Sequence, residues 1–301
     1  MSLFAPDKNG ILRESKWLQP LSDPPGGRPL CRDADLKLIA KYLDDVFSAG
    51  QARNLFVYGE PGTGKTVMVK YVLAEVTKHA AEMKVPVRTA YVNAGKTRNP
   101  YYTMDEIVKQ LGIKVPDAGW QMFRLKKAFE QVLAEEPVLI AIDEVDTVIF
   151  KEKEPLVYYL SRQPRTTLIL ISNCMSDIVK LPEKTLSTLH PVLIEAEPYT
   201  EEEITQILKE RTEHTFKPGT TNDDCLAIIA RAVNKAGDIR FGFRVLLTAG
   251  LLAEKARKQT IDTTDVTSAI KKERGVKDLK QLDAIKEQLL NLKKRYERSH
   301  H

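Results

Sequence analysis

Gly59-Glu60-Pro61-Gly62-Thr63-Gly64-Lys65-Thr66 is the stretch that decides the fold of this 301-residue chain. It matches the pattern G-x-x-x-x-G-K-[ST], in which glycines let backbone N–H groups close around phosphate oxygens without clashes from Cβ atoms. The apolar run Leu55–Tyr58 before it predicts a buried strand, and residues 65 to about 80 after it predict a helix. The N-terminus of that helix would present its partial positive charge to the phosphates. We therefore expect every residue of this phosphate loop (residues 59–66) to contact a bound nucleotide.

Two residues of the loop and two further carboxylates have separate expected roles. Lys65 would reach the β- and γ-phosphates as a point charge, and the hydroxyl of Thr66 would ligate Mg²⁺. The stretch Val138–Glu144 predicts a second buried strand, which ends in two acidic residues. Asp143 would hold the Mg²⁺ from its other side, and Glu144 would polarise the attacking water. The sequence thus predicts a site that binds ATP or ADP with Mg²⁺ and hydrolyses ATP.

Asn173 and Arg240 are candidates for sensing the nucleotide. Asn173 follows Ser172 at the end of the next predicted strand, and would face the γ-phosphate and the water if that strand neighbours the Asp143 strand. Asp238 can cap a helix and leave Arg240 in its first turn, where it could contact the γ-phosphate. Both residues join Glu144 as candidate catalytic residues, and Arg240 is also a candidate nucleotide-binding residue. The alternatives are that Asn173 is an ordinary turn residue and that Arg240 is an ordinary surface arginine.

Strands and helices alternate around the phosphate loop. Apolar strands are expected at 55–58, 89–93, 138–142, 167–172 and 192–196, and helices at about 33–48, 65–80, 102–111, 120–134 and 153–161. This alternation predicts an α/β fold with a parallel sheet covered on both faces. Only helices follow Pro198, at about 200–213, 222–235, 239–258 and 263–273, and the first begins with a capping box of Thr200 and Glu203. They predict a small all-α lid domain.

The domain boundaries follow from this pattern. Residues 1–198 are expected to form the P-loop α/β domain, with residues 1–30 as its N-terminal arm, and residues 199–273 the helical lid. Residues 274–298 are expected to form a basic amphipathic tail helix, and residues 299–301 look like the remnant of a purification tag.

The tail helix has an apolar seam and most of the excess charge. Its seam residues are spaced alternately by three and four positions, as in a coiled coil: Leu282, Ile285, Leu289, Leu292 and Tyr296. The seam could pack against the helical domain, or serve self-association or a partner helix. From Lys271 to Ser299, ten Lys and Arg stand against five Asp and Glu, and this surplus equals the net charge of +5. Such a tail can contact phosphates or acidic lipids, or can simply be a solvated helix face.

Composition excludes several classes of protein. The hydrophobic share of 43% is enough for a core, so global disorder is not expected. No apolar run approaches the length of a membrane span, and the N-terminus lacks the pattern of a signal peptide. The three cysteines are widely spaced and show no disulfide or metal pattern: Cys31, Cys174 and Cys225. A cytoplasmic protein without membrane contact is the expectation.

Together these residues resemble the AAA+ ATPases, and in particular the archaeal and eukaryotic origin-recognition and replication-initiator family. The resemblance covers about residues 15–270, and its matching stretches run in order: Arg32–Asp35, Asn54–Gly59, Tyr91–Asn93, Asn99–Tyr101, Ile142–Asp146, Tyr159–Arg162, Ile171–Asn173, Phe216–Gly219 and Gly237–Arg240. The phosphate loop and the Asp-Glu pair are common to AAA+ proteins. Asn99–Tyr101 and Phe216–Gly219 favour the initiators.

The resemblance implies an ATP-controlled switch that acts on duplex DNA at or near replication origins. In that family an insertion after the second strand touches DNA, and here it would lie within about residues 97–119, where Lys96 and Arg98 stand beside two tyrosines. We expect weak binding, mostly to DNA phosphates, through this insertion or the basic tail. Self-association or a partner AAA+ subunit is also implied.

The sequence departs from the family in two ways. The family normally continues into a winged-helix DNA-binding domain, which is not expected in this chain because it ends soon after the helical domain. The family also has an arginine that enters a neighbour's ATP site, whereas the stretch Leu181–Leu189 offers Glu183 or Lys184. A lysine cannot make the forked contact of an arginine, so we expect slow hydrolysis.

Two other functions compete with an initiator. One is an AAA+ regulatory ATPase that acts on a protein partner, in transposition, plasmid maintenance or a clamp-loader-like role. The other is a catalytically dead nucleotide-binding scaffold, against which the intact Lys65, Asp143 and Glu144 argue. Retention on duplex DNA would separate the initiator from the regulator.

Overall fold

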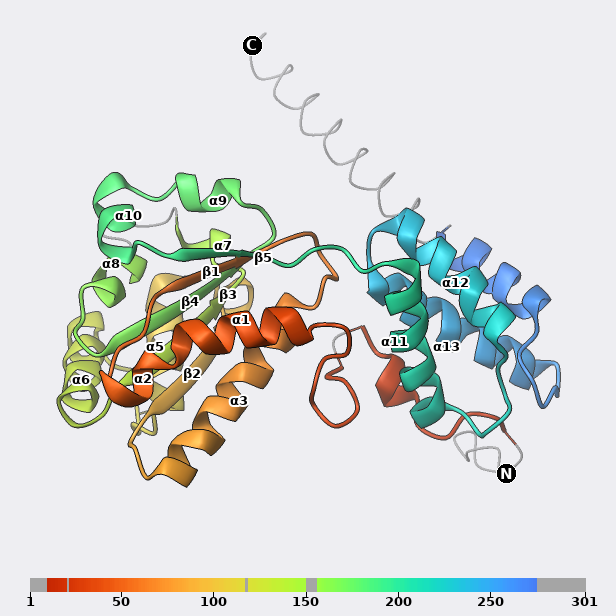
Figure 1. Cartoon of the computed structure of the whole chain (residues 1–301), viewed down its shortest axis with the longest axis horizontal. Coiled ribbons are helices and arrows are strands. Elements are labelled where there is room, and N and C mark those ends of the chain that lie inside the picture. The colour runs from red at the N-terminus through yellow and green to blue at the C-terminus, as the bar shows by residue number, and fades with distance from the viewer. Residues whose placement is uncertain (1–9, 21, 117–118, 150–155, 275–301) are drawn as a thin grey trace, which may run out of the picture. The chain divides into compact units, whose positions relative to one another are not determined.

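The computed structural model describes residues 10–20, 22–116, 119–149 and 156–274, which divide into two units. Residues 26–198 form the sheet unit (Figure 1). The described residues of 10–25 and of 199–274 form the helical unit. The predicted tail seam, residues 275–298 of the predicted tail helix and the tag-like ending lie outside the described residues. No helix among the described residues is long and apolar enough to span a membrane.

In the described part of the sheet unit, five parallel strands lie in the order β2-β3-β4-β1-β5. Their bounds are β1 Leu55–Tyr58, β2 Arg88–Asn93, β3 Val138–Asp143, β4 Thr166–Ser172 and β5 Val192–Glu195. Every residue of β3 and β4 is buried, as helices on both faces of a parallel sheet require. The predicted α/β fold with a parallel sheet is confirmed.

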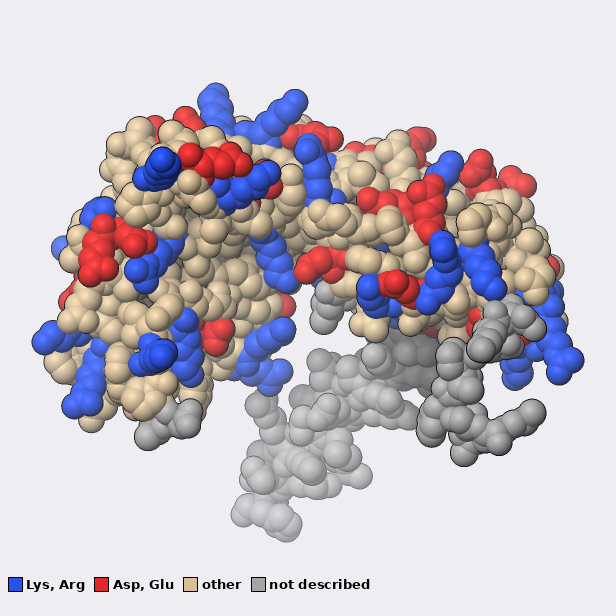
Figure 2. All heavy atoms as spheres, turned by 90° about the horizontal axis from the view of Figure 1, so that it is seen from below, with Lys and Arg blue, Asp and Glu red and all other residues tan. Residues whose placement is uncertain are grey.

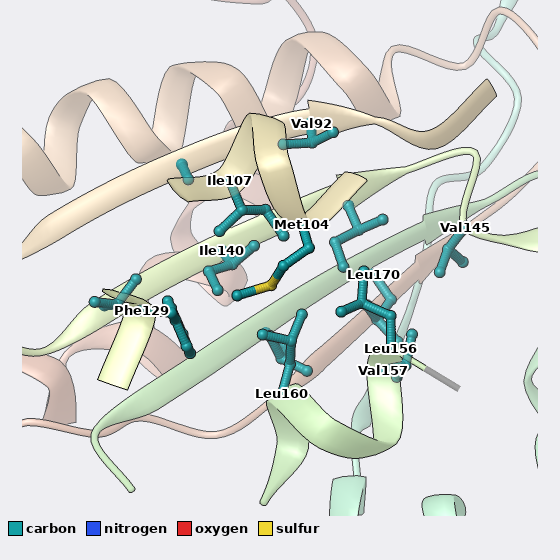
Figure 3. Packing of buried hydrophobic residues seen from close by; sticks show 14 of the residues in the cluster. Val92, Met104, Ile107, Phe129, Ile140, Val145, Leu156, Val157, Leu160 and Leu170 are labelled. Carbon is teal, nitrogen blue, oxygen red and sulfur yellow. The ribbon is translucent and has the colours of Figure 1, made fainter. Parts of the chain in front are cut away.

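Side chains alternate between two apolar layers along each strand. Leu139 and Ala141 of β3 pack in one layer with the helices α1 Asp33–Leu43, α2 Asp45–Ser48 and α3 Lys65–Met83. Ile140 and Ile142 pack in the other layer with α5 Pro100–Gln110, α6 Met122–Glu135 and α8 Leu156–Ser161. Figure 3 shows this second layer, where six labelled side chains converge: Met104, Ile107, Phe129, Ile140, Leu160 and Leu170.

The described residues of the sheet unit also form four short helices, none of which the sequence predicts separately. They are α4 Ala94–Thr97, α7 Asp146–Ile149, α9 Ser176–Val179 and α10 Glu183–Leu189. Segments of four to seven residues are too short to show helical periodicity. The predicted insertion at 97–119 contains α5, which starts at Pro100 behind the cap Asn99, and residues 117–118 of it are not described.

The helical unit contains a 3₁₀ turn and a succession of α-helices. Their bounds are η1 Ser15–Leu18, α11 Glu201–Thr215, α12 Asp223–Ala236 and α13 Ile239–Lys255, and residues 263–274 are also helical. The capping box of Thr200 and Glu203 is present, with both of its hydrogen bonds. The predicted succession of helices after Pro198 is therefore found.

Residues 10–20 and 22–25 of the predicted arm belong to the helical unit, whereas the sequence placed residues 1–30 with the sheet domain. Leu12 forms an antiparallel bridge with Phe216, and Leu18 is fully buried. The buried guanidinium of Arg211 donates hydrogen bonds to the carbonyls of Trp17 and Asp23, both at 2.9 Å. The physical reason is that apolar arm residues need cover, and that arm carbonyls need donors once they leave water.

Candidate functional site: a nucleotide-binding site

The phosphate loop connects the carboxyl end of β1 to the first turn of α3, which starts at Lys65. Gly64 has a φ of 85°, a left-handed conformation that favours glycine. Gly59 lies so close to the chain after β5 that a Cβ on it would come within 2.4 Å of the carbonyl oxygen of Ala196. The loop therefore needs glycine at both positions, for the conformation at one and for space at the other.

Lys65 lies within the loop that it is expected to serve. Its side chain is buried, with 6% of the residue exposed. The Nζ atom donates hydrogen bonds to the carbonyl oxygens of Gly59, at 2.7 Å, and Glu60, at 2.8 Å. The main chain of the loop thus holds the ammonium group inside the turn, close to the N-terminus of α3.

The two candidate Mg²⁺ ligands are in direct contact. The hydroxyl of Thr66 donates to Oδ2 of Asp143 at 2.7 Å, and the amide N–H of Glu144 donates to Oδ1 at 2.9 Å. Asp143 is buried, with 4% exposed. A hydroxyl and a carboxylate are hard oxygen ligands of the kind that Mg²⁺ prefers. The residues that converge here therefore fit the expected ion.

Glu144 lies across the start of α4. Its backbone has a φ of 52°, and its Oε1 atom accepts a hydrogen bond from Nδ2 of Asn93 at 3.1 Å. The other side-chain oxygen, Oε2, lies so close to Gly95 that a Cβ there would come within 1.8 Å of it. Asn93 also caps α4, because its Oδ1 accepts from the amide N–H of Lys96 at 3.0 Å. The second carboxylate is thus held by one side chain of the neighbouring strand.

Asn173 follows β4 at the same edge of the sheet. β4 pairs with β3, with Leu170 opposite Ile142. The strand before Asn173 is therefore the neighbour of the strand that ends in Asp143, as the predicted role of Asn173 requires. The side chain of Asn173 is exposed, whereas that of Ser172 is buried and donates to Asp177. In open α/β sheets, ligands bind at the carboxyl ends of the strands, and Asn173 meets this condition.

Arg240 belongs to the helical unit and lies in the first turn of α13. Asp238 caps this helix, and its carboxylate accepts from the backbone N–H of Arg240 at 2.9 Å. The predicted cap is therefore found. Within the described part of the chain, no ion pair or side-chain hydrogen bond involves the guanidinium, which is half-buried.

Residues 183 and 184, which occupy the region of the family's trans-acting arginine, open helix α10. The ammonium of Lys184 lies 4.7 Å from the centre of the Tyr158 ring, and Nη1 of Arg162 donates to the Tyr158 hydroxyl at 2.7 Å. The Lys184 side chain is exposed, and its ammonium group lies over the Tyr158 ring of the same unit.

Sequence reasoning missed the contacts that Tyr91 and Asn93 make with the two candidate carboxylates. Both belong to β2, and the Tyr91 hydroxyl donates to Oδ2 of Asp143 at 2.7 Å. The only signal in the sequence was polar groups two residues apart at the end of a strand, which places them on one face. Their targets could not be inferred because the sequence does not reveal that β2 pairs with β3.

The parallel sheet, the phosphate loop and the Asp-Glu pair at the end of β3 define the sheet unit as a P-loop ATPase domain of the AAA+ class. Comparison with known families agrees with this class. An AAA ATPase domain matches residues 28–171, and a Cdc6 AAA+ ATPase-type lid domain matches residues 205–271.

Individual relatives narrow the class further. The chain is 30% identical over 254 residues to an ORC1-type DNA replication protein of Pyrococcus horikoshii, covering 80% of this chain and 61% of the relative. It is 26% identical over 256 residues to ORC1-type DNA replication protein 1 of Methanothermobacter thermautotrophicus, covering 83% and 66%. The structure of the Aeropyrum pernix ORC1 protein in complex with DNA is similar, with a TM-score of 0.77 and 27% identity, covering 88% of this chain and 70% of that one. The chain belongs to the origin-recognition and replication-initiator family of AAA+ ATPases.

The chain spans somewhat less than two thirds of the length of these curated relatives.

Proposed function

We propose that this protein is an ATP-binding, slowly hydrolysing switch of replication-initiator type, which acts on duplex DNA at or near replication origins. The observation that carries the ATPase part is the convergence of Thr66 and Asp143 beside the phosphate loop. The DNA part is supported by the relatives, which are named DNA replication proteins, and by the Aeropyrum pernix ORC1 protein, which was solved with DNA.

Each side chain has one task in this proposal. The phosphate loop and Lys65 bind the phosphates, and Thr66 and Asp143 hold Mg²⁺. When bound, the ion would neutralise charge on the phosphate oxygens. Glu144 accepts a proton from the attacking water, and Asn173 orients that water. The stacked Lys184 lacks the guanidinium fork that speeds hydrolysis from a neighbouring subunit, so turnover is slow.

Arg240 is proposed to contact the γ-phosphate of ATP bound to the sheet unit. Arg240→Ala should leave ADP affinity within about twofold and lower the affinity for a non-hydrolysable ATP analogue about tenfold, since a charge-assisted hydrogen bond contributes about 1.5–3 kcal/mol. It should also remove any compaction that ATP but not ADP produces. Isothermal titration and small-angle scattering of the same samples measure both effects.

Arg244→Ala is the matched control for this experiment, because Arg244 lies on the same helix and pairs with Glu273 at 3.4 Å. It should leave both affinities unchanged. Identical scattering of the wild-type protein with ATP and with ADP would remove the basis for a switch through Arg240.

The candidate DNA contacts surround α4 and the start of α5. Lys96 and Arg98 are exposed, and so is Tyr102, with 57% of its surface accessible. Tyr101 is fixed instead, because its hydroxyl donates to the carbonyl of Trp120 at 2.7 Å. Figure 2 shows one face of the molecule, on which Lys and Arg side chains are interspersed with Asp and Glu. Contacts from exposed side chains such as Lys96 and Arg98 go to DNA phosphates, and they position a protein without reading the base sequence.

Duplex binding by the full chain is expected to be micromolar or weaker, sensitive to salt and nearly independent of sequence. Lys96→Glu with Arg98→Glu should flatten the dependence of affinity on salt, because each lost phosphate contact lowers the number of counterions released. Truncation after residue 274 should do so instead if the tail carries the binding. Fluorescence anisotropy with origin-like and scrambled duplexes at several salt concentrations gives these slopes.

Charge reversal at Lys78 is the control, since this lysine is exposed on α3, outside the predicted insertion, and should leave the salt dependence unchanged. Nanomolar, sequence-selective binding would show that another element reads DNA. Absence of binding even at low salt would contradict the DNA part of the proposal and favour the regulator that acts on a protein partner.

A further inference from the structure

Tyr91 makes a contact at the site that none of the roles above uses. Its hydroxyl donates to Oδ2 of Asp143 at 2.7 Å, the same oxygen that accepts from Thr66. Tyr91 lies opposite Ala141 in the pairing of β2 with β3, two residues before the Asn93–Asp143 pair. The tyrosine therefore reaches along the sheet surface to the carboxylate, from the edge strand.

We propose that Tyr91 is a positioning residue for Mg²⁺, which sets the affinity of the site for the ion by orienting Asp143. This inference rests on the proposed nucleotide site. Three donors hold the Asp143 carboxylate: the Tyr91 and Thr66 hydroxyls at Oδ2, and the Glu144 amide at Oδ1. Thr66 is itself a candidate ligand, so its bond to Asp143 joins two groups that would both contact the ion. Tyr91 is not a candidate ligand, and its bond can remain. Partners of this kind around a metal ligand fix its orientation.

The surroundings of Tyr91 fix the ring and keep the hydroxyl protonated. The backbone N–H of Tyr91 donates to Oε1 of Gln110 at 2.8 Å. This bond gives the N–H a partner, although β2 is an edge strand with no neighbouring strand on that side. The ammonium of Lys70 lies 5.0 Å from the ring centre. Burial, with the nearby Asp143 carboxylate, raises the pKa of the Tyr91 hydroxyl above its usual value. The hydroxyl is thus a donor throughout the physiological pH range.

Two side chains of β2 each hold one of the two carboxylates. Tyr91 holds Asp143, and Asn93 holds Glu144. These residues are two apart, and so lie on one face of the strand. A change at Tyr91 should therefore alter the metal dependence of nucleotide binding without removing the contact to Glu144.

The test is the Mg²⁺ dependence of ADP binding by the full chain, with Tyr91→Phe as the variant. This substitution keeps the ring and removes only the hydroxyl. We expect the Mg²⁺ concentration at half-effect, measured by fluorescence of a labelled ADP, to rise about 10- to 100-fold. ADP affinity in excess EDTA should stay within about twofold of wild type, because the phosphate loop is unaltered.

Tyr159→Phe is the matched control. The Tyr159 hydroxyl also donates to a carboxylate, that of Glu130 at 3.0 Å, but in the contact between α8 and α6. An equal Mg²⁺ midpoint for Tyr91→Phe and wild type would overturn the inference, and so would an equal shift in Tyr159→Phe. Loss of ADP binding by Tyr91→Phe in EDTA would also overturn it, because the tyrosine would then support the loop itself. Failure of the wild-type protein to bind ADP under any condition would instead overturn the proposed function.

Discussion

Lys65→Ala is expected to reduce ATP affinity about 100-fold or more, which places binding below detection in isothermal titration at micromolar protein. A charge-assisted hydrogen bond contributes about 1.5–3 kcal/mol, and Lys65 is the loop's expected contact with two phosphates. In the structure this cation is buried against the loop carbonyls of Gly59 and Glu60. Its removal leaves both the bound phosphates and these carbonyls without their donor.

Lys78→Ala provides the comparison, because Lys78 is an exposed lysine on the same helix, α3. It should bind ATP as the wild type does. Unfolding curves of both variants would show whether the Lys65 substitution acts on binding rather than on the fold. Wild-type ATP affinity in Lys65→Ala would mean that nucleotide does not bind at the phosphate loop.

Glu144→Gln is expected to bind ATP normally and to hydrolyse it about 10²- to 10⁴-fold more slowly, the range typical of a lost general base. A glutamine has the same shape, and its carbonyl oxygen can still accept the hydrogen bond from Asn93. It cannot accept a proton from the water. Phosphate release in a single turnover, with ATP affinity measured by titration, separates the two effects.

Glu130→Gln is the control for charge and shape, because Glu130 is exposed on α6 and bonds Tyr159. It should hydrolyse ATP at the wild-type rate. Unchanged hydrolysis in Glu144→Gln would assign the base to another residue. Loss of ATP binding in Glu144→Gln would show that the carboxylate supports the site rather than the chemistry.

Local patterns predicted much of the fold and the position of the phosphate loop between β1 and α3. The strand Val138–Asp143 was visible as an apolar run, and the start of α11 as a capping box. Boundaries moved by a few residues: the helix expected over 33–48 is two helices that divide at Asp44, and the strand expected from residue 89 starts at Arg88. An apolar run and a capping box depend only on residues that are neighbours in sequence, so the sequence is enough to predict them.

The sequence by itself determined the P-loop class, because the pattern in residues 59–66 is a local backbone requirement with its own phosphate chemistry. Only the tertiary structure decided which side chains hold the two carboxylates and where the arm packs. Tyr91 reaches Asp143 because β2 pairs with β3, and Arg211 bonds an arm nearly two hundred residues earlier in the chain. These contacts join segments far apart in sequence, and they form because polar groups that leave water need hydrogen-bond partners, which no local pattern reveals.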